Sequence, residues 1–229
     1  MKKFVTKLSS IAIVTAALAF SQNSLAKTEG MYIGFDLSRN NSDHKYRLDS
    51  ASDFSLSTSS NVDEIASFDN DGYGYGVNLK HAYNFNGLYI APVIFYETIN
   101  TVATDELKDQ VSVNSRHGVK LELGYDVTKN ISAYVNYGVG VVSYEVNFTN
   151  SQLGKQYGKD SSEIFGLGLN YNLDKNWVLS YEYNMQKVDL GTRVGSYDTT
   201  VDPRFLMGID HLRIKTEIKS MKLGVSYKF

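Results

Sequence analysis

Cysteine is absent from the chain, and proline occurs only twice in 229 residues. Without cysteine there is no disulfide framework and no acceptor for a lipoprotein acyl group. Proline interrupts the hydrogen bonding of a sheet and is scarce, whereas 17 tyrosines and 11 phenylalanines make aromatic residues common. Aromatic residues favour strands, so the composition predicts β structure without covalent cross-links.

Long apolar runs are also missing. The run at residues 11–20 is too short to cross a bilayer of about 30 Å as a helix, and no later run reaches the length of a membrane-spanning helix. This run follows three lysines and precedes a small-residue site that ends at Ala26, which is the order of a secretory signal peptide. We expect cleavage after Ala26, with residues 1–26 as the signal peptide and residues 27–229 as one mature domain.

An excess of basic residues is absent too. The chain has 23 Lys and Arg against 25 Asp and Glu, and loss of the signal peptide removes three lysines and no acids, leaving 20 against 25. Nucleic-acid-binding domains are usually basic, so we expect no nucleic-acid partner. The length that remains suits one barrel or sandwich.

Polar and apolar residues alternate cleanly in residues 119–127. Val119, Leu121 and Leu123 alternate with Lys120 and Glu122, which places the two classes on opposite faces of a strand. A charged face cannot point into hydrocarbon, so it points into a barrel interior while the apolar face meets lipid. Related patterns predict eight strands, at residues 31–38, 73–83, 88–96, 119–127, 131–141, 164–172, 177–186 and 215–229.

The connections between these strands alternate in length. Short polar turns are expected at 84–87, 128–130 and 174–176, and long polar loops at 39–72, 97–115, 148–161 and 189–213. This asymmetry is typical of barrels with short periplasmic turns and long extracellular loops. The sequence therefore predicts an all-β fold, an eight-stranded antiparallel up-and-down transmembrane β-barrel over 27–229. The facing of 88–96 stays open, because that segment is apolar on both faces and contains Pro92.

The last predicted strand ends in alternating Met221, Leu223, Val225, Tyr227 and Phe229. With Tyr227 and Phe229 at its end, this strand resembles the C-terminal signature by which the barrel assembly machinery recognises outer-membrane barrels. The mature chain resembles the small surface barrels that include the opacity proteins, OmpX, Ail and the Adr-type adhesins of rickettsiae. The resemblance implies a bacterial outer-membrane location among outer-membrane lipids, no cofactor, and adhesion to host surfaces or capture of serum proteins such as vitronectin.

Charged residues on the inward faces admit two interpretations, a polar ion path or a network that plugs the lumen. An eight-stranded barrel has an interior just wide enough for its own side chains, which favours the plug. The residues expected to form this lumen network are Lys80, Lys120, Glu122, Glu182 and Lys222.

Two loop segments are candidate binding sites. Arg204, Phe205 and Leu206 combine a cation with exposed apolar groups, a composition found in binding hot spots. The alternative, that Phe205 and Leu206 fold back on the barrel rim, stays open. Lys155, Tyr157 and Lys159 form a second, basic and aromatic patch suited to an acidic partner or to lipopolysaccharide phosphates.

One pair of residues suggests catalysis. Ser115 and His117 are two apart in a strand on its lipid-facing side, as in some lipid-modifying outer-membrane hydrolases, but no orienting carboxylate is identifiable. The histidines His44, His81 and His211 show no metal-ligand spacing, so we expect no metal site. The expected function is thus a non-enzymatic adhesin or host-protein binder. A purely structural barrel is the first alternative, and a hydrolase using Ser115 and His117 is the second.

Overall fold

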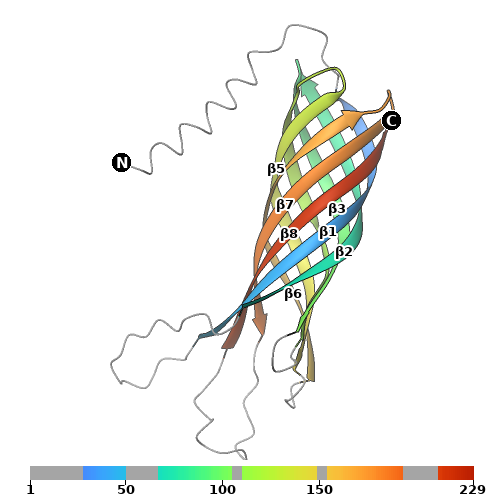
Figure 1. Ribbon diagram of the computed structural model, residues 1–229. Helices are drawn as coiled ribbons and strands as arrows, with labels where there is room; N and C mark the ends of the chain where they lie inside the picture. Colours follow the sequence, from blue (N-terminus) through green and yellow to red (C-terminus); the bar gives the residue numbers. More distant parts are fainter. Residues whose placement is uncertain (1–27, 50–66, 105–109, 149–153, 193–210) are drawn as a thin grey trace, which may run out of the picture.

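The computed structural model describes residues 28–49, 67–104, 110–148, 154–192 and 211–229. Eight strands run up and down and close into an antiparallel barrel in which β1 pairs with β8, as the sequence predicts (Figure 1). No helix in the described part of the chain is long and apolar enough to cross a membrane. The strands are β1 Gly30–Asp49, β2 Ser67–Phe85, β3 Leu88–Thr104, β4 Gln110–Asp126, β5 Ile131–Phe148, β6 Gly154–Asn172, β7 Trp177–Thr192 and β8 His211–Lys228.

Tight turns join the strands at the end of the barrel where the chain finishes, as predicted. Asn86 and Gly87 have φ of 55° and 92°, the left-handed pair that a two-residue hairpin turn requires. In the β6–β7 turn, the Oδ1 atom of Asp174 accepts the backbone N–H groups of Asn176 and Trp177, both at 2.7 Å. Those two hydrogen bonds lower the pKa of the Asp174 carboxyl.

An apolar belt surrounds the half of the barrel nearest these turns. Its outward side chains are mostly apolar and exposed, and the belt covers about nine residues of each strand, the length of a membrane-spanning strand. It comprises residues 31–37, 73–85, 88–96, 119–127, 131–141, 165–173, 177–185 and 221–229.

The facing of β3, left open by the sequence, is settled by burial. Tyr89, Val93 and Phe95 point into the barrel, while Pro92 and Ile94 point outward. The pairing of β3 with β2 has no partner recorded at Pro92, between Lys80↔Val93 and Tyr83↔Ile90. Proline has no N–H to donate, which explains the interruption.

All eight strands continue beyond the apolar belt, so the predicted loop boundaries are wrong. Residues 39–49, 67–72, 97–104, 110–115, 148, 154–161, 189–192 and 211–213 were expected in loops and are strand. We call the parts of all eight strands that lie beyond the apolar belt the extension. The outer face of the extension is mostly polar. Its strands therefore lack the alternation of polar and apolar residues by which a membrane-spanning strand is recognised in a sequence. The predicted loop residues 50–66, 105–109, 149–153 and 193–210 lie outside the described residues.

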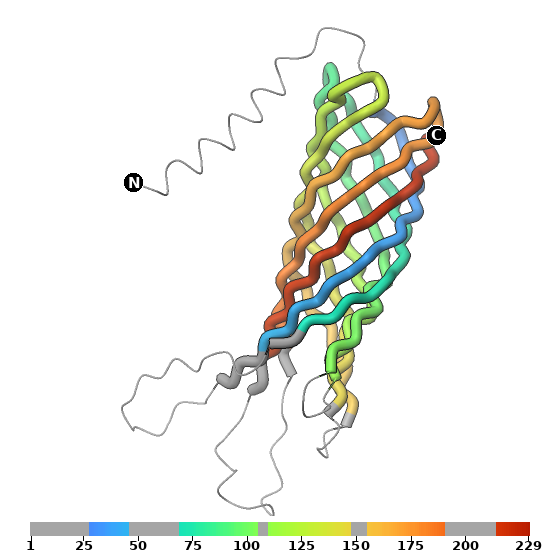
Figure 2. The backbone as a smooth tube through the Cα atoms, in the orientation of Figure 1, coloured from blue at the N-terminus to red at the C-terminus, as the bar shows by residue number. Residues whose placement is uncertain are grey.

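The extension divides into two four-stranded sheets, as Figure 2 shows near the end opposite the turns. Pairing between β2 and β3 is recorded as far as Gly76↔Glu97, and between β6 and β7 as far as Ile164↔Gln186. Beyond these points, within the described residues, β7, β8, β1 and β2 remain paired in one sheet, and β3 to β6 in the other.

Apolar side chains fill the space between these two sheets. The cluster is almost completely buried and draws on β3, β4 and β5 from one sheet and on β7 and β8 from the other. Its members are Ile99, Val111, Val113, Val142, Tyr144, Val146, Val188, Leu190, Ile214 and Ile218. The wall therefore changes along the strands. In the belt it is polar inside and apolar outside, whereas in the extension the outer face is mostly polar and the apolar cluster lies inside, beside buried polar residues such as Asn40, Ser42 and His44.

Candidate functional site

The predicted lumen residues lie inside the barrel and contact one another in ion pairs. Lys80 Nζ lies 3.1 Å from Glu122 Oε2, and Lys120 Nζ lies 2.6 Å from both carboxylate oxygens of Glu182. The Tyr134 hydroxyl donates to Glu182 Oε2 at 3.0 Å. The third lysine, Lys222, lies 3.6 Å from Glu182. All five predicted residues thus belong to two neighbouring networks on the lumen side.

Two further charged residues extend this network, and the sequence analysis missed both. Arg116 is completely buried and pairs with Glu97, which also pairs with Lys222. Arg116 Nη1 donates to Gln186 Oε1 at 3.0 Å, and its Nη2 donates to Ser220 Oγ at 3.2 Å. The sequence held a signal for Glu97 only. Inward-facing positions of β3 alternate with outward ones, and this alternation continues from Val93 and Phe95 to residue 97.

Cations and carboxylates both line the lumen. Among the described residues, four cations and four carboxylates are buried, and the partly buried Asp36 accepts a hydrogen bond from Asn78 at 2.8 Å. The fourth carboxylate, Asp126, accepts hydrogen bonds from Thr28 Oγ1 at 2.5 Å and from Asn84 at 2.8 Å near the turns. The ion pairs in the belt and the apolar cluster in the extension occupy the interior at both levels, which supports a plug and disfavours an ion path.

His44 is a buried titratable group of the extension. Its Nδ1 atom lies 2.8 Å from the Thr216 hydroxyl, between β1 and β8. The side chain is completely buried, and burial lowers its pKa to about 4 although Asp43 acts in the opposite direction. This imidazole is therefore neutral at physiological pH.

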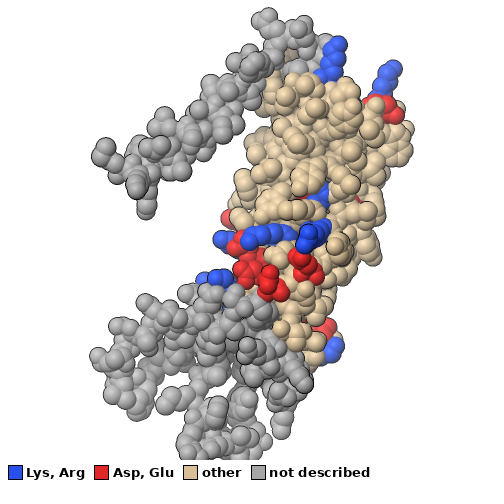
Figure 3. Space-filling model, in the orientation of Figure 1, with Lys and Arg blue, Asp and Glu red and all other residues tan. Residues whose placement is uncertain are grey.

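The outer face of the extension carries charge. Figure 3 shows a band of acidic and basic side chains between the uncharged wall and the residues drawn in grey. Glu217 lies 3.6 Å from Lys187 and 3.4 Å from Lys219, which connects β7 and β8. Arg39 lies 2.7 Å from Asp71 and lowers the pKa of that carboxyl.

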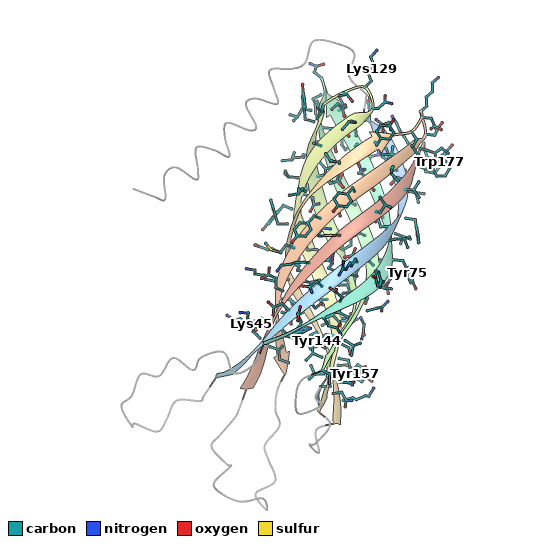
Figure 4. The ribbon with its side chains drawn as sticks, in the orientation of Figure 1. Lys45, Tyr75, Lys129, Tyr144, Tyr157 and Trp177 are labelled. Atoms are coloured by element: carbon teal, nitrogen blue, oxygen red, sulfur yellow. The ribbon has the colours of Figure 1, made fainter. Side chains whose placement is uncertain are left out.

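The predicted basic and aromatic patch lies on this outer face, on a strand and not in a loop. Lys155, Tyr157 and Lys159 occupy alternate outward positions of β6, and Tyr157 is 72% exposed. Lys155 lies 2.7 Å from Glu145 of β5, which raises the pKa of the lysine. Figure 4 shows Tyr157 near one end of the barrel and Lys129 of a turn at the other.

The other predicted site residues are placed as follows. Arg204, Phe205 and Leu206 lie outside the described residues. Ser115 and His117 occupy the outer side of β4 at the border of the belt, beside a register shift between Val113 and Ser115. In the described part of the chain, no group of three or more His, Asp or Glu side chains is arranged to hold a metal ion.

Tyr227 and Phe229 end the last strand in an aromatic row. The ring of Tyr227 contacts those of Trp177 and Phe229 edge-on, both at 5.1 Å between centroids. The backbone N–H of Phe229 donates to the carbonyl of Met31 at 3.0 Å, which joins the end of the chain to the first strand.

Residues 27–229 match the sequence profile of the OmpA-like transmembrane domain. The chain belongs to this family. OmpA-like transmembrane domains of this kind are small eight-stranded barrels of the bacterial outer membrane, and this protein is one of them.

Solved structures of several outer-membrane barrels are similar to this OmpA-like domain. OprG of Pseudomonas aeruginosa is 12% identical in sequence, with a TM-score of 0.50, and the matched region covers 89% of this chain and 98% of OprG. Ail of Yersinia pestis is 14% identical, with a TM-score of 0.44, and the matched region covers 88% of this chain and 100% of Ail. Neisserial surface protein A is 13% identical, with a TM-score of 0.42, and the matched region covers 85% of this chain and 97% of the neisserial protein. No curated protein sequence matches the chain.

Proposed function

We propose that this OmpA-like domain is a surface attachment protein, which binds a host cell-surface or serum protein, such as vitronectin, without catalysis. The binding surface comprises the outer face of the extension and the connections next to it, including Arg204, Phe205 and Leu206.

The observation that carries this proposal is the extension itself. A strand rises about 3.3 Å per residue and tilts by about 40° in such barrels, so some ten residues beyond the belt reach roughly 25 Å from the membrane. A membrane anchor alone does not require these residues. They have their own apolar core and a charged outer face, which together form a rigid support for recognition.

The filled interior supports the same conclusion. Transport needs a continuous aqueous or apolar path, whereas ion pairs occupy the lumen in the belt and the apolar cluster occupies it in the extension. Surface recognition is therefore the activity that this architecture favours.

The test measures binding of immobilised host serum proteins, with purified vitronectin as one probe, to the refolded protein in lipid nanodiscs. One variant replaces Lys155, Tyr157 and Lys159 with serine, and a second does the same at Arg204, Phe205 and Leu206. Loss of a true hot spot lowers affinity by about thirty-fold or more.

The matched control replaces Lys129 and Lys175 with serine, because these lysines lie in the turns at the opposite end. We expect the control to bind as the wild type does and at least one triple variant to bind weakly. A wild-type protein that binds no host protein, on cells or in serum, would overturn the proposal in favour of a purely structural barrel.

A further inference from the structure

Two opposite charges occupy neighbouring positions on the outer wall where β6 and β7 separate. The last recorded pair of these strands is Ile164↔Gln186, and the next position of the antiparallel register holds Glu163 on β6 and Lys187 on β7. Both side chains point outward and are exposed. Opposite charges placed across two strands in this way normally attract each other and stabilise the sheet.

Each of these two charges has a different partner instead. The Tyr137 hydroxyl of β5 donates a hydrogen bond to the Glu163 carboxylate. Lys187 Nζ lies 3.6 Å from Glu217 of β8, a carboxylate that also lies 3.4 Å from Lys219. An ammonium group has three N–H donors, and the Lys187 side chain is 69% exposed, so Lys187 can serve a second acceptor.

A cavity of about 470 Å³ lies beside these charges on the outer wall. Its apolar lining consists of Tyr137, Phe165 and Met185, which form one row across β5, β6 and β7 in the belt. Glu163 and Lys187 line its other side, next to the extension. The cavity therefore crosses the border between the apolar and the charged parts of the wall, at the level where lipid head groups meet acyl chains.

The floor of the cavity is closed toward the lumen. The Gln186 amide donates to the Ser162 carbonyl at 3.2 Å, to the Ser162 hydroxyl at 2.9 Å and to the Gly140 carbonyl at 2.9 Å. These hydrogen bonds join β5, β6 and β7 on the inner side of the wall. The cavity therefore opens outward, and the molecules that meet the wall at this level are membrane lipids.

We propose that this cavity binds the phosphoethanolamine head group of a zwitterionic phospholipid of the surrounding membrane. The ammonium group lies against the Glu163 carboxylate and the rings of Tyr137 and Phe165, and the phosphate lies against Lys187. The acyl chains continue along the apolar belt. This lipid site goes beyond the proposed attachment function and does not depend on it.

The charges around the cavity favour a zwitterion over an anion. Besides Glu163, the outer faces of β7 and β8 carry Asp189 and Glu217, which would repel a head group with only negative charge. Lys187 in turn disfavours a head group with only positive charge. A head group with one amine and one phosphate matches both signs of charge within a single molecule.

The experiment measures which lipids remain bound when the mature protein is released from nanodiscs in a mass spectrometer. The nanodiscs contain equal amounts of phosphatidylethanolamine and phosphatidylglycerol with identical acyl chains, so both lipids have the phosphate but only the first has the amine. We expect the wild type to retain phosphatidylethanolamine over phosphatidylglycerol by about five-fold. Equal retention, or preference for phosphatidylglycerol, would overturn the proposal.

Two variants separate the two halves of the head group. Glu163→Gln should abolish the preference, because it removes the charge that faces the amine. Lys187→Ser should lower retention of both lipids and leave their ratio unchanged, because both carry the phosphate. The matched control is Glu145→Gln, the same change at a carboxylate of β5 that pairs with Lys155 and does not line the cavity.

Gel mobility without boiling shows that each variant is folded. A preference that survives Glu163→Gln, or that Glu145→Gln removes equally, would overturn the amine contact and with it the proposal. Unchanged retention of both lipids by Lys187→Ser would overturn the phosphate contact in the same way.

A photoreactive phosphatidylethanolamine, with a diazirine at the head-group end of one acyl chain, locates the bound lipid. We expect its cross-links to concentrate on the peptides that contain Phe165 and Met185 in the wild type and in Glu145→Gln, and to lose this concentration in Glu163→Gln. Cross-links spread evenly around the belt would show an unselective lipid annulus only and would overturn the site.

Discussion

The guanidinium of Arg116 on β4 donates to the side-chain oxygen of Gln186 on β7 at 3.0 Å, across the interior of the barrel. Gln186 in turn donates to the Ser162 carbonyl of β6. The buried charge network of the belt is therefore joined directly to the point where β6 and β7 separate, and it supports both sheets of the extension.

Replacing Arg116 with leucine should destabilise the barrel strongly. The change leaves the buried Glu97 with Lys222 as its remaining ion-pair partner, and removal of one member of a buried pair costs about 3 to 5 kcal/mol. Urea unfolding in detergent, followed by gel mobility without boiling, measures the effect. The control Arg39→Ala removes an exposed pair, which solvent screens, and should cost far less. Equal losses in the two variants would contradict the network.

Gly168 makes room for the ring of Tyr134. A Cβ atom at position 168 would lie 2.4 Å from Tyr134 Cζ, so Gly168→Ala must displace the ring and break its hydrogen bond to Glu182. We expect a loss of about 1 to 3 kcal/mol, as for other overpacked cores. Tyr134→Phe removes only the hydroxyl and should cost less, about 1 kcal/mol. A Gly168→Ala variant that is as stable as the wild type would show that the Tyr134 ring has space elsewhere.

His44 should make the extension acid-sensitive. Its folded pKa of about 4 lies below the ordinary value of 6.5, so the unfolded chain takes up a proton first as the pH falls. The stability due to the neutral imidazole is complete above about pH 6.5 and declines until about pH 4, by roughly 3 kcal/mol. Hydrogen exchange of β1 and β8 at pH 7 and pH 4.5 measures this loss. His44→Gln should reduce the difference between the two pH values, and an unchanged difference would assign it to other groups.

The membrane half of the fold could be predicted from the sequence because lipid imposes a strict rule on each strand. Lys120 and Glu122 had to point inward, and the turn at Asn86 and Gly87 has a distinctive local sequence. The extension obeys no such rule. Its strands have mostly polar outer faces, and no local pattern encodes where the pairing between β6 and β7 stops.

Register shifts also hide Arg116 from sequence reasoning. Inward residues of β4 are Val111 and Val113 in the extension but Arg116 and Lys120 below it, a change from odd to even positions. The shifts at Val113/Ser115 and Thr98/Thr101 produce this change. An extra residue in a strand exchanges inside for outside, so an unbroken alternation cannot be extrapolated through it.

Tyr227 and Phe229 should matter for assembly more than for stability. Replacing both with serine removes the aromatic row next to Trp177 and the resemblance to the assembly signature. We expect surface abundance to fall by about ten-fold, while the control Tyr157→Ser, which changes an exposed aromatic residue of the extension, leaves it unchanged. Protease accessibility on intact cells measures both variants. Normal abundance without the two aromatic residues would rule out the signature.

If the interior of the barrel is closed, its function must lie on the outer surface. Single-channel recording of the refolded mature protein in planar bilayers tests whether the interior is closed, because the buried ion pairs of the belt and the apolar cluster of the extension leave no ion path. The account predicts no stable conductance above the bare bilayer. A reproducible, stable open level that disappears when the protein is denatured would contradict it.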